Sequence, residues 1–173
     1  ADMTADDLDV SELEIDMKIK LNSEGLADWH VVRNTHTWTP RELHFQFFNR
    51  HLWFHVHSNV PYDPHTEKLF EPDVWYDVKI QYSVEEKNLI FYINGQLDSE
   101  VEFSTAHPIK LSRGYYGIWS GHRNFNGEIH HVKFTDTESK EVVSKLTPKS
   151  AKKAKYMSFL KKKDCDYFKS NAG

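Results

Sequence analysis

Two short segments of the chain carry histidine, glutamine or tryptophan at every second position. In extended strands, such alternation places these side chains on one face. If residues 41–48 and 52–58 pair as a hairpin, that face carries His44, Gln46, Trp53, His55 and His57. An indole ring stacks on the C–H face of a sugar while neighbouring donors and acceptors meet its hydroxyls. The pattern indicates carbohydrate contact, and the competing interpretation is a half-buried face whose histidines only contact their neighbours.

A second group of aromatic and polar residues falls in one predicted loop region. Loops carry binding residues on rigid β scaffolds, so this region predicts a binding rim, with simple loop packing as the alternative. Its members are Tyr116, Trp119, Arg123 and Asn124. No run of residues has the spacing of a calcium loop, and the pair His55 and His57 has too few ligands for zinc.

Acidic residues near the start of the chain have the spacing of a carboxylate pair. Glu14 and Asp16 point the same way in a strand, and glycosidases act through a pair of carboxyl groups. The next position on that face is Lys18, which cannot replace a carboxylate. The chain also lacks a Gly-x-Ser-x-Gly motif and a phosphate-binding loop. We therefore predict that the protein is not an enzyme.

These residues must be held by strands, because the dominant pattern is period-two alternation interrupted by turn residues. Residues 13–21 alternate aliphatic with charged side chains and predict a half-buried strand. Asn94-Gly95 is a strong hairpin signal, because both residues tolerate a positive φ. We expect nine to twelve short strands with no helix between them. This spacing predicts an all-β sandwich or barrel.

The two ends of the chain have opposite charge. Residues 1–16 contain seven acids and no base, whereas residues 145–163 contain eight lysines and no acid. We predict an acidic N-terminal tail over residues 1–10 and a basic C-terminal extension over residues 138–173. Between them, no apolar run is long enough for a transmembrane segment.

The C-terminal extension also has a helix signal. Thr147-Pro148 is typical of a helix start, and the residues after it predict a basic amphipathic helix over 148–163. Docking of this helix, on the sandwich, on the acidic N-terminus or in a homo-oligomer, is favoured over a plain solvated tail and over binding to nucleic acid or membrane. The single cysteine, Cys165, excludes an internal disulfide and leaves the compartment open.

Three further segments share a pattern of aromatic residues, alternating aliphatics and Asn-Gly. They are Trp75-Tyr76-Asp77-Val78-Lys79-Ile80-Gln81-Tyr82, then Leu89-Ile90-Phe91-Tyr92-Ile93-Asn94-Gly95-Gln96-Leu97, and finally Gly117-Ile118 with Phe125-Asn126-Gly127-Glu128-Ile129 and Val132-Lys133-Phe134. In this order they resemble the laminin-G-like branch of the concanavalin A-like lectin/glucanase fold. The resemblance implies a two-sheet antiparallel β-sandwich, a jelly roll, over residues 11–137, with the basic C-terminal helix outside it.

The resemblance implies a binding function but leaves the ligand open, because members of this fold bind glycans, proteins, lipids or steroids and some hydrolyse glucans. Residues 12–18 are similar to the E-x-D-x-E signature of laminarinase-type glucanases, except for Lys18. In laminarinase-type glucanases, a segment as close to the chain start as residues 12–18 forms a strand at the edge of the core and not the active-site strand.

Laminin-G-like domains often bind calcium at a rim through Asp and Asn, so the resemblance implies calcium as a cofactor, with Asp63 and Asn124 as ligands. We expect a non-catalytic lectin-like module whose partner is a glycan or glycoprotein. The alternatives are a structural or protein-interaction subunit that assembles through the C-terminal helix, and a divergent glucan hydrolase. The resemblance favours an extracellular or cell-surface location.

Overall fold

A computed structural model describes residues 8–23, 30–35, 40–56, 64–111, 114–116 and 125–146. These residues form twelve strands and no helix, as expected from the alternation. The strands are β1 (Leu8–Val10), β2 (Glu12–Leu21), β3 (His30–Thr35), β4 (Leu43–Phe48), β5 (His51–Val56), β6 (Trp75–Ser83), β7 (Asn88–Ile93), β8 (Gln96–Glu102), β9 (Ile109–Leu111), β10 (Gly114–Tyr116), β11 (Gly127–Asp136) and β12 (Glu141–Leu146).

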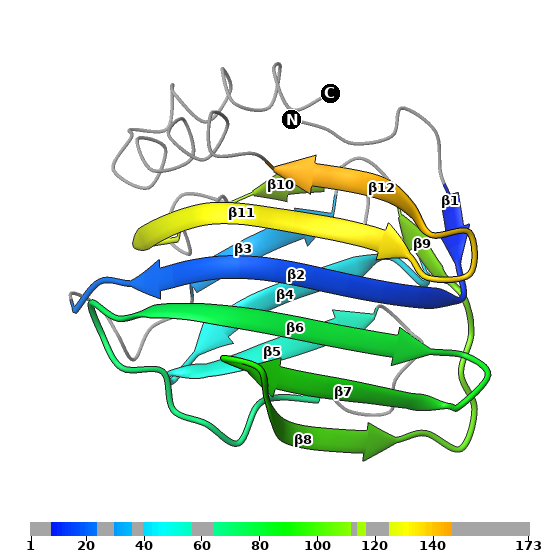
Figure 1. The fold of residues 1–173 in the computed structure, drawn as a ribbon, viewed down its shortest axis with the longest axis horizontal. Helices are drawn as coiled ribbons and strands as arrows, with labels where there is room; N and C mark the ends of the chain where they lie inside the picture. The colour runs from blue at the N-terminus through cyan, green and yellow to red at the C-terminus, as the bar shows by residue number, and fades with distance from the viewer. Residues whose placement is uncertain are drawn as a thin grey trace.

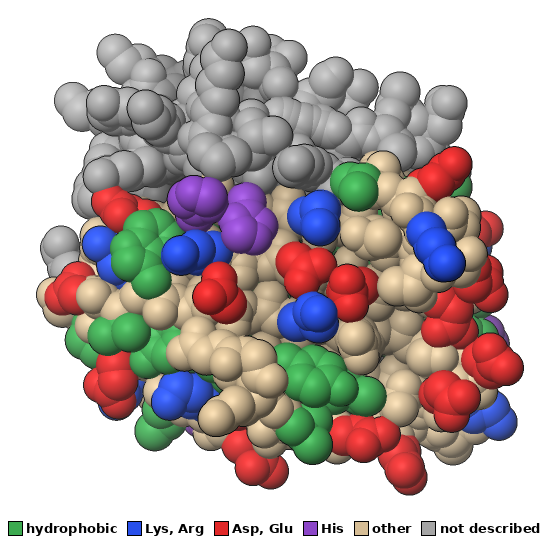
Figure 2. Space-filling view, viewed as in Figure 1, with side chains coloured by type: hydrophobic (Ala, Val, Ile, Leu, Met, Phe, Trp, Pro, Cys, Tyr) green, Lys and Arg blue, Asp and Glu red, His purple; other side chains and the backbone are tan. Residues whose placement is uncertain are grey.

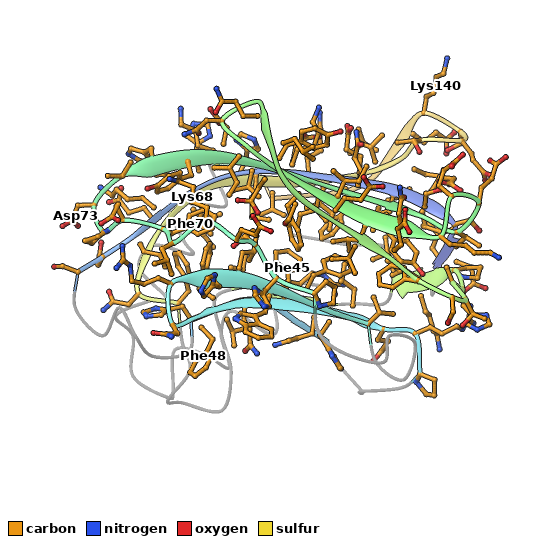
Figure 3. The ribbon with its side chains drawn as sticks, turned by 90° about the horizontal axis from the view of Figure 1, so that it is seen from below. Phe45, Phe48, Lys68, Phe70, Asp73 and Lys140 are labelled. Atoms are coloured by element: carbon orange, nitrogen blue, oxygen red, sulfur yellow. The ribbon has the colours of Figure 1, made fainter. Side chains whose placement is uncertain are left out.

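The strands form two antiparallel sheets that face each other (Figure 1). The larger sheet has the order β12-β11-β2-β6-β7-β8 and the smaller one β10-β3-β4-β5, while β1 and β9 pair separately. Phe45 and Phe70 lie between the two layers, whereas Phe48 points away from the larger sheet (Figure 3). Phe45 meets Phe134 of the opposite sheet with ring centroids 6.2 Å apart. The predicted β-sandwich is confirmed.

The strand predicted over residues 13–21 is β2, and its alternation is complete. Its five apolar side chains face the core and are at most 2% exposed, whereas its charged ones are half-buried on the other face. The expectation that this segment lies at the edge of the core is wrong, because β2 pairs with β11 on one side and β6 on the other. An inner face that is aliphatic throughout suits an interior strand better than an edge strand.

Two-residue turns fix the register of two hairpins. Asn49 and Arg50 have φ of 50° and 68° between β4 and β5, and Asn94 and Gly95 have φ of 52° and 78° between β7 and β8. Positive φ at both central residues is the mark of the type I′ turn, whose twist matches the flanking strands. Both predicted hairpins are therefore present.

The strands extend past the expected sandwich limits at both ends. β1 lies inside the predicted tail 1–10, where it pairs with β9, and β12 lies inside the predicted extension, where it pairs with β11. Leu8–Val10 is too short for alternation to be recognised, and Val142-Val143 sits among charged residues. The predicted helix 148–163 lies outside the described residues. In the described part of the chain no helix is long and apolar enough to cross a membrane.

Gly127 offers a test of how tightly the larger sheet is packed. A Cβ at this position would lie 2.1 Å from the backbone oxygen of Lys20 and 2.9 Å from the ring of Phe125. Gly127→Ala should therefore lower the free energy of unfolding by about 2–3 kcal/mol, the usual cost of overpacking, measured by urea denaturation. Gly95→Asn is the comparison variant, because no atom lies within 4 Å of its Cβ position. Its φ of 78° strains any residue with a side chain, so this variant should cost about 1 kcal/mol. Equal costs for the two variants would contradict this packing.

Candidate functional site

The outer face of the larger sheet carries charges of opposite sign across neighbouring strands. The register sets Lys18 of β2 opposite Asp77 of β6 and His131 of β11. One step along, Asp16 lies opposite Lys79 and Lys133. Figure 2 shows red and blue side chains side by side over the middle of this face, with two purple histidines next to them. Opposite charges on facing positions stabilise the pairing of strands.

A hollow of about 400 Å³ opens on this face. Its polar lining comes from four strands of the sheet and consists of Asp16, Asp77, Lys79, Gln81, Tyr92 and His131. Gly95 borders the hollow, and the space where a Cβ would stand is empty to 4 Å. The hollow thus offers carboxylate acceptors, ammonium and amide donors, an imidazole and one aromatic ring within reach of a single small ligand.

Glu14 organises the polar groups beside the hollow. Its Oε1 accepts a hydrogen bond from Nε2 of Gln81 at 3.1 Å and lies 3.6 Å from Nζ of Lys79. Burial raises the pKa of Asp16 above its ordinary value, and the charge of Glu14 and a hydrogen bond between the two carboxyl groups raise it further, while Lys79 opposes them. Asp16 is therefore shifted toward the protonated form, which donates as well as accepts.

Two consecutive histidines, His130 and His131, face the same side at the rim of the hollow. Burial lowers the pKa of His131, and His130 lowers it further, while the carboxylate of Asp77 acts in the opposite direction. Lys133 and Lys18 add smaller lowering effects. The imidazole of His131 is therefore held toward its neutral form, which has one donor and one acceptor nitrogen.

The predicted tryptophan–histidine face lies on the smaller sheet. In the β4–β5 hairpin, His44 is opposite His55 and Gln46 is opposite Trp53, and the alternate residues of both strands are buried in the core. These four predicted residues therefore share one face, as the alternation indicated.

The chain itself already contacts several groups on that face. The Trp53 ring packs against His65 at 4.2 Å between centroids, and its Nε1 donates to the carbonyl oxygen of Phe48 at 3.3 Å. His44 is only 3% exposed. A sugar stacking on Trp53 would have to displace His65 or use the opposite side of the indole.

The remaining predicted site residues cannot be placed. His57, Asp63, Trp119, Arg123 and Asn124 lie outside the described residues, and only the backbone of Tyr116, in β10, is described. Calcium binding through Asp63 and Asn124 stays a prediction. Among the described side chains there is no group of three or more His, Cys, Asp or Glu arranged to hold a metal ion.

The hollow was missed because its residues are far apart in the sequence. Asp16, Asp77, Tyr92 and His131 belong to different strands, and each looks like the ordinary polar position of an alternating strand. One signal was available: Asp77, Lys79 and Gln81 are the outward positions of the first motif used for the family resemblance. If the three motif segments had been placed in one sheet, their outward residues would have been expected to form a shared surface.

Comparison with known proteins supports the fold. The family model described as the concanavalin A-like lectin/glucanases superfamily matches residues 6–141. A candidate carbohydrate-binding protein from Bacteroides ovatus superimposes with a TM-score of 0.57 at 14% identity, over 75% of this chain and 38% of that one. Domains LG4-5 of the mouse laminin α1 chain superimpose with a TM-score of 0.55 at 13% identity, over 75% of this chain and 36% of that one. No curated protein sequence matches the chain.

The raised pKa of Asp16 predicts a stability cost with a definite pH dependence. The protonated carboxyl group of Asp16 is favoured by the fold, so it contributes its full stability at a pH below 3.8, the ordinary pKa of Asp. That stability is lost as the pH rises through the higher pKa of the folded state. Asp16→Asn cannot ionise, so its free energy of unfolding should exceed that of the wild type at neutral pH. The difference should vanish below pH 3.8. Urea denaturation across this pH range measures it.

Glu100→Gln controls for the change in net charge, because Glu100 is an exposed acid on the edge strand β8. An Asp16→Asn variant that is less stable than the wild type at neutral pH would show that the carboxylate is stabilising and would contradict the raised pKa.

Proposed function

The chain belongs to the concanavalin A-like lectin/glucanases superfamily, and we propose that it is a non-catalytic module that binds carbohydrate in the hollow on the outer face of its larger sheet. One observation carries the proposal. Hydrogen-bond donors, acceptors and one aromatic ring line a single cavity of about 400 Å³, which is within the range of small-molecule sites.

Sugar hydroxyls both donate and accept, so a surface with groups of both kinds suits them. Asp16 and Asp77 supply acceptors, Lys79 supplies donors, and the side chain of Tyr92 supplies a ring face and a hydroxyl. Gln81 adds an amide whose Nε2 is held by Glu14. Because the ionic groups are arranged in cross-strand rows, they are in place before a ligand arrives, which reduces the entropy lost on binding.

The carboxyl groups beside the hollow are poorly arranged for glycoside hydrolysis. A retaining glycosidase needs two carboxyl groups about 5–5.5 Å apart, with the glycosidic bond between them. Glu14 instead contacts Gln81 and Lys79, and Lys18 occupies the next outward position on β2. This arrangement supports binding without catalysis.

The larger sheet is favoured over the Trp53 face of the smaller sheet as the place of binding. Trp53 already packs against His65 and donates to a backbone carbonyl. The side chain of Tyr92, by contrast, makes no hydrogen bond among the described residues, and its half-buried ring borders the hollow. A ligand therefore meets fewer internal contacts at Tyr92 than at Trp53.

Substitution of the two aromatic residues distinguishes the two faces. On a glycan array, probed with and without calcium, Tyr92→Ala should lower affinity by on the order of tenfold or more, since central aromatic contacts carry much of a binding energy. Tyr92→Phe keeps the ring and should lose less. Trp53→Ala is the matched control on the smaller sheet and should bind like the wild type.

Loss of binding in Trp53→Ala alone would move the site to the smaller sheet. An array on which the wild-type chain binds no glycan, with or without calcium, would contradict the carbohydrate proposal as a whole.

A second experiment addresses catalysis directly. The wild-type chain should release no reducing sugar from the oligosaccharides that it binds, and Glu14→Gln should leave that result unchanged. Reducing-sugar release that Glu14→Gln abolishes would overturn the non-catalytic assignment and support the glucan hydrolase alternative.

A further inference from the structure

A β-bulge in β11 turns two successive side chains to the same face of the larger sheet. Ile129 pairs with Ile19 and His131 pairs with the adjacent Lys18, so His130 is an extra residue without a partner on β2. Without the bulge, His130 would point to the opposite face from His131. The bulge thus places the two imidazoles in contact on one face, beside the hollow that His131 lines. Bulges of this kind are enriched where a side chain must be re-aimed for function.

The two imidazole rings meet through the same kind of nitrogen. Their centroids are 5.2 Å apart with an interplanar angle of 83°, and the two Nδ1 atoms are 2.9 Å apart. One Nδ1 must carry the hydrogen and the other must accept it, so the lone pair of the acceptor and the N–H of the donor point into one small space. A metal ion to one side of the line that joins the two nitrogens would be bound by both, once each ring turns its Nδ1 lone pair toward it.

We propose that His130 and His131 bind a divalent transition-metal ion of the Cu²⁺ or Ni²⁺ type through their Nδ1 atoms. Metal–imidazole nitrogen distances are about 2.0–2.1 Å, so two nitrogens 2.9 Å apart subtend roughly 90° at the metal. That is the angle between neighbouring ligands in tetragonal Cu²⁺ and Ni²⁺ sites, and it is smaller than the tetrahedral angle that zinc prefers.

The protons balance without an external acid or base. In the neutral pair, the donor ring carries its hydrogen on Nδ1 and the acceptor ring carries its hydrogen on Nε2. When the metal binds, the first ring moves its hydrogen from Nδ1 to Nε2 by exchange with water. Both rings then present an Nδ1 lone pair, and no net proton is released.

The charged groups around the pair come from three strands. Asp77 of β6 carries a negative charge that favours a bound cation, and its carboxylate lines the same hollow as His131. The positive charges of Lys18 in β2 and Lys133 in β11 disfavour a cation. His130 is exposed, so water can fill the remaining coordination positions.

A second histidine pair provides a contrast within the same molecule. The rings of His51 and His65 are 5.1 Å apart, but both Nδ1 atoms hydrogen-bond to the carbonyl oxygen of Thr66, at 2.8 Å and 3.0 Å. A carbonyl only accepts, so each of these Nδ1 atoms carries a hydrogen and neither offers a lone pair to a shared metal. Equal ring proximity thus predicts metal binding at one pair and not at the other.

The metal site does not depend on the proposed carbohydrate function, although an ion at this rim would direct its open positions toward the hollow. The test is a titration of the ¹⁵N-labelled full chain with CuCl₂, followed by paramagnetic broadening of assigned amide signals. Signals of His130, His131, Lys18 and Asp77 should broaden first. In a parallel calorimetric titration, Cu²⁺ should bind more tightly than Ni²⁺, and Zn²⁺ should bind less tightly than either.

His131→Ala should abolish the broadening at these residues and weaken Cu²⁺ binding there by on the order of tenfold or more, since even residues behind the ligands cost about 10–100-fold. Asp77→Asn should weaken it by about tenfold. His65→Ala is the matched control and should leave the broadening near His130 unchanged. Neither His131 nor His65 is buried in the core. An unchanged thermal unfolding midpoint is the check that each variant folds.

Three outcomes would overturn the metal site. One is broadening that begins at His51 and His65 instead of His130 and His131. Another is broadening near His130 that persists in His131→Ala. The third is the absence of any Cu²⁺-dependent change at these amides.

Discussion

The inner face of β2 must be buried for the rest of the molecule to keep its shape. Five apolar side chains of this strand, at most 2% exposed, pack under the smaller sheet, and β2 itself joins β11 to β6. Side chains in a strand alternate strictly, so a slip of one residue would turn every buried group outward. Burial of Ile15 and Met17 therefore fixes the outward direction of Asp16 and Lys18.

The composition of the outer surface follows from this constraint and from the register of the neighbouring strands. The same pairing that closes the core sets Asp16 against Lys79 and Lys18 against Asp77. Facing charges of this kind add only a little to the stability of strand pairing, whereas Asp16 is shifted toward its neutral form at a cost. A row of polar groups that costs stability is more easily understood as a binding surface than as a structural one.

The two histidine features differ in how they arise. On the smaller sheet, His44 and His55 share a face because of simple alternation. On the larger sheet, His130 and His131 share a face only because a bulge interrupts alternation. Regular strands supply the scaffold of this protein, and an irregularity supplies its most unusual pair of side chains.

The same contrast explains what the sequence could predict. Strands with unbroken alternation, such as β2, and hairpins with Asn-Gly or Asn-Arg turns were recognisable from local residues alone. β3 was not, because its bulge between Val31 and Arg33 leaves the adjacent Val31 and Val32 both buried. The Trp53 face was predictable because two neighbouring segments carry it. The hollow was not, because Asp16, Tyr92 and His131 meet only through sheet register.

The central claim is that a carbohydrate binds on the larger sheet, and one measurement tests it most directly. Amide chemical shifts of the ¹⁵N-labelled chain, recorded while an oligosaccharide that binds on the array is added, locate the occupied face. The account predicts that the perturbed signals cluster at Asp77, Lys79, Tyr92 and His131 and are absent from the β4–β5 hairpin. Perturbations confined to His44, Gln46, Trp53 and His55 would contradict it.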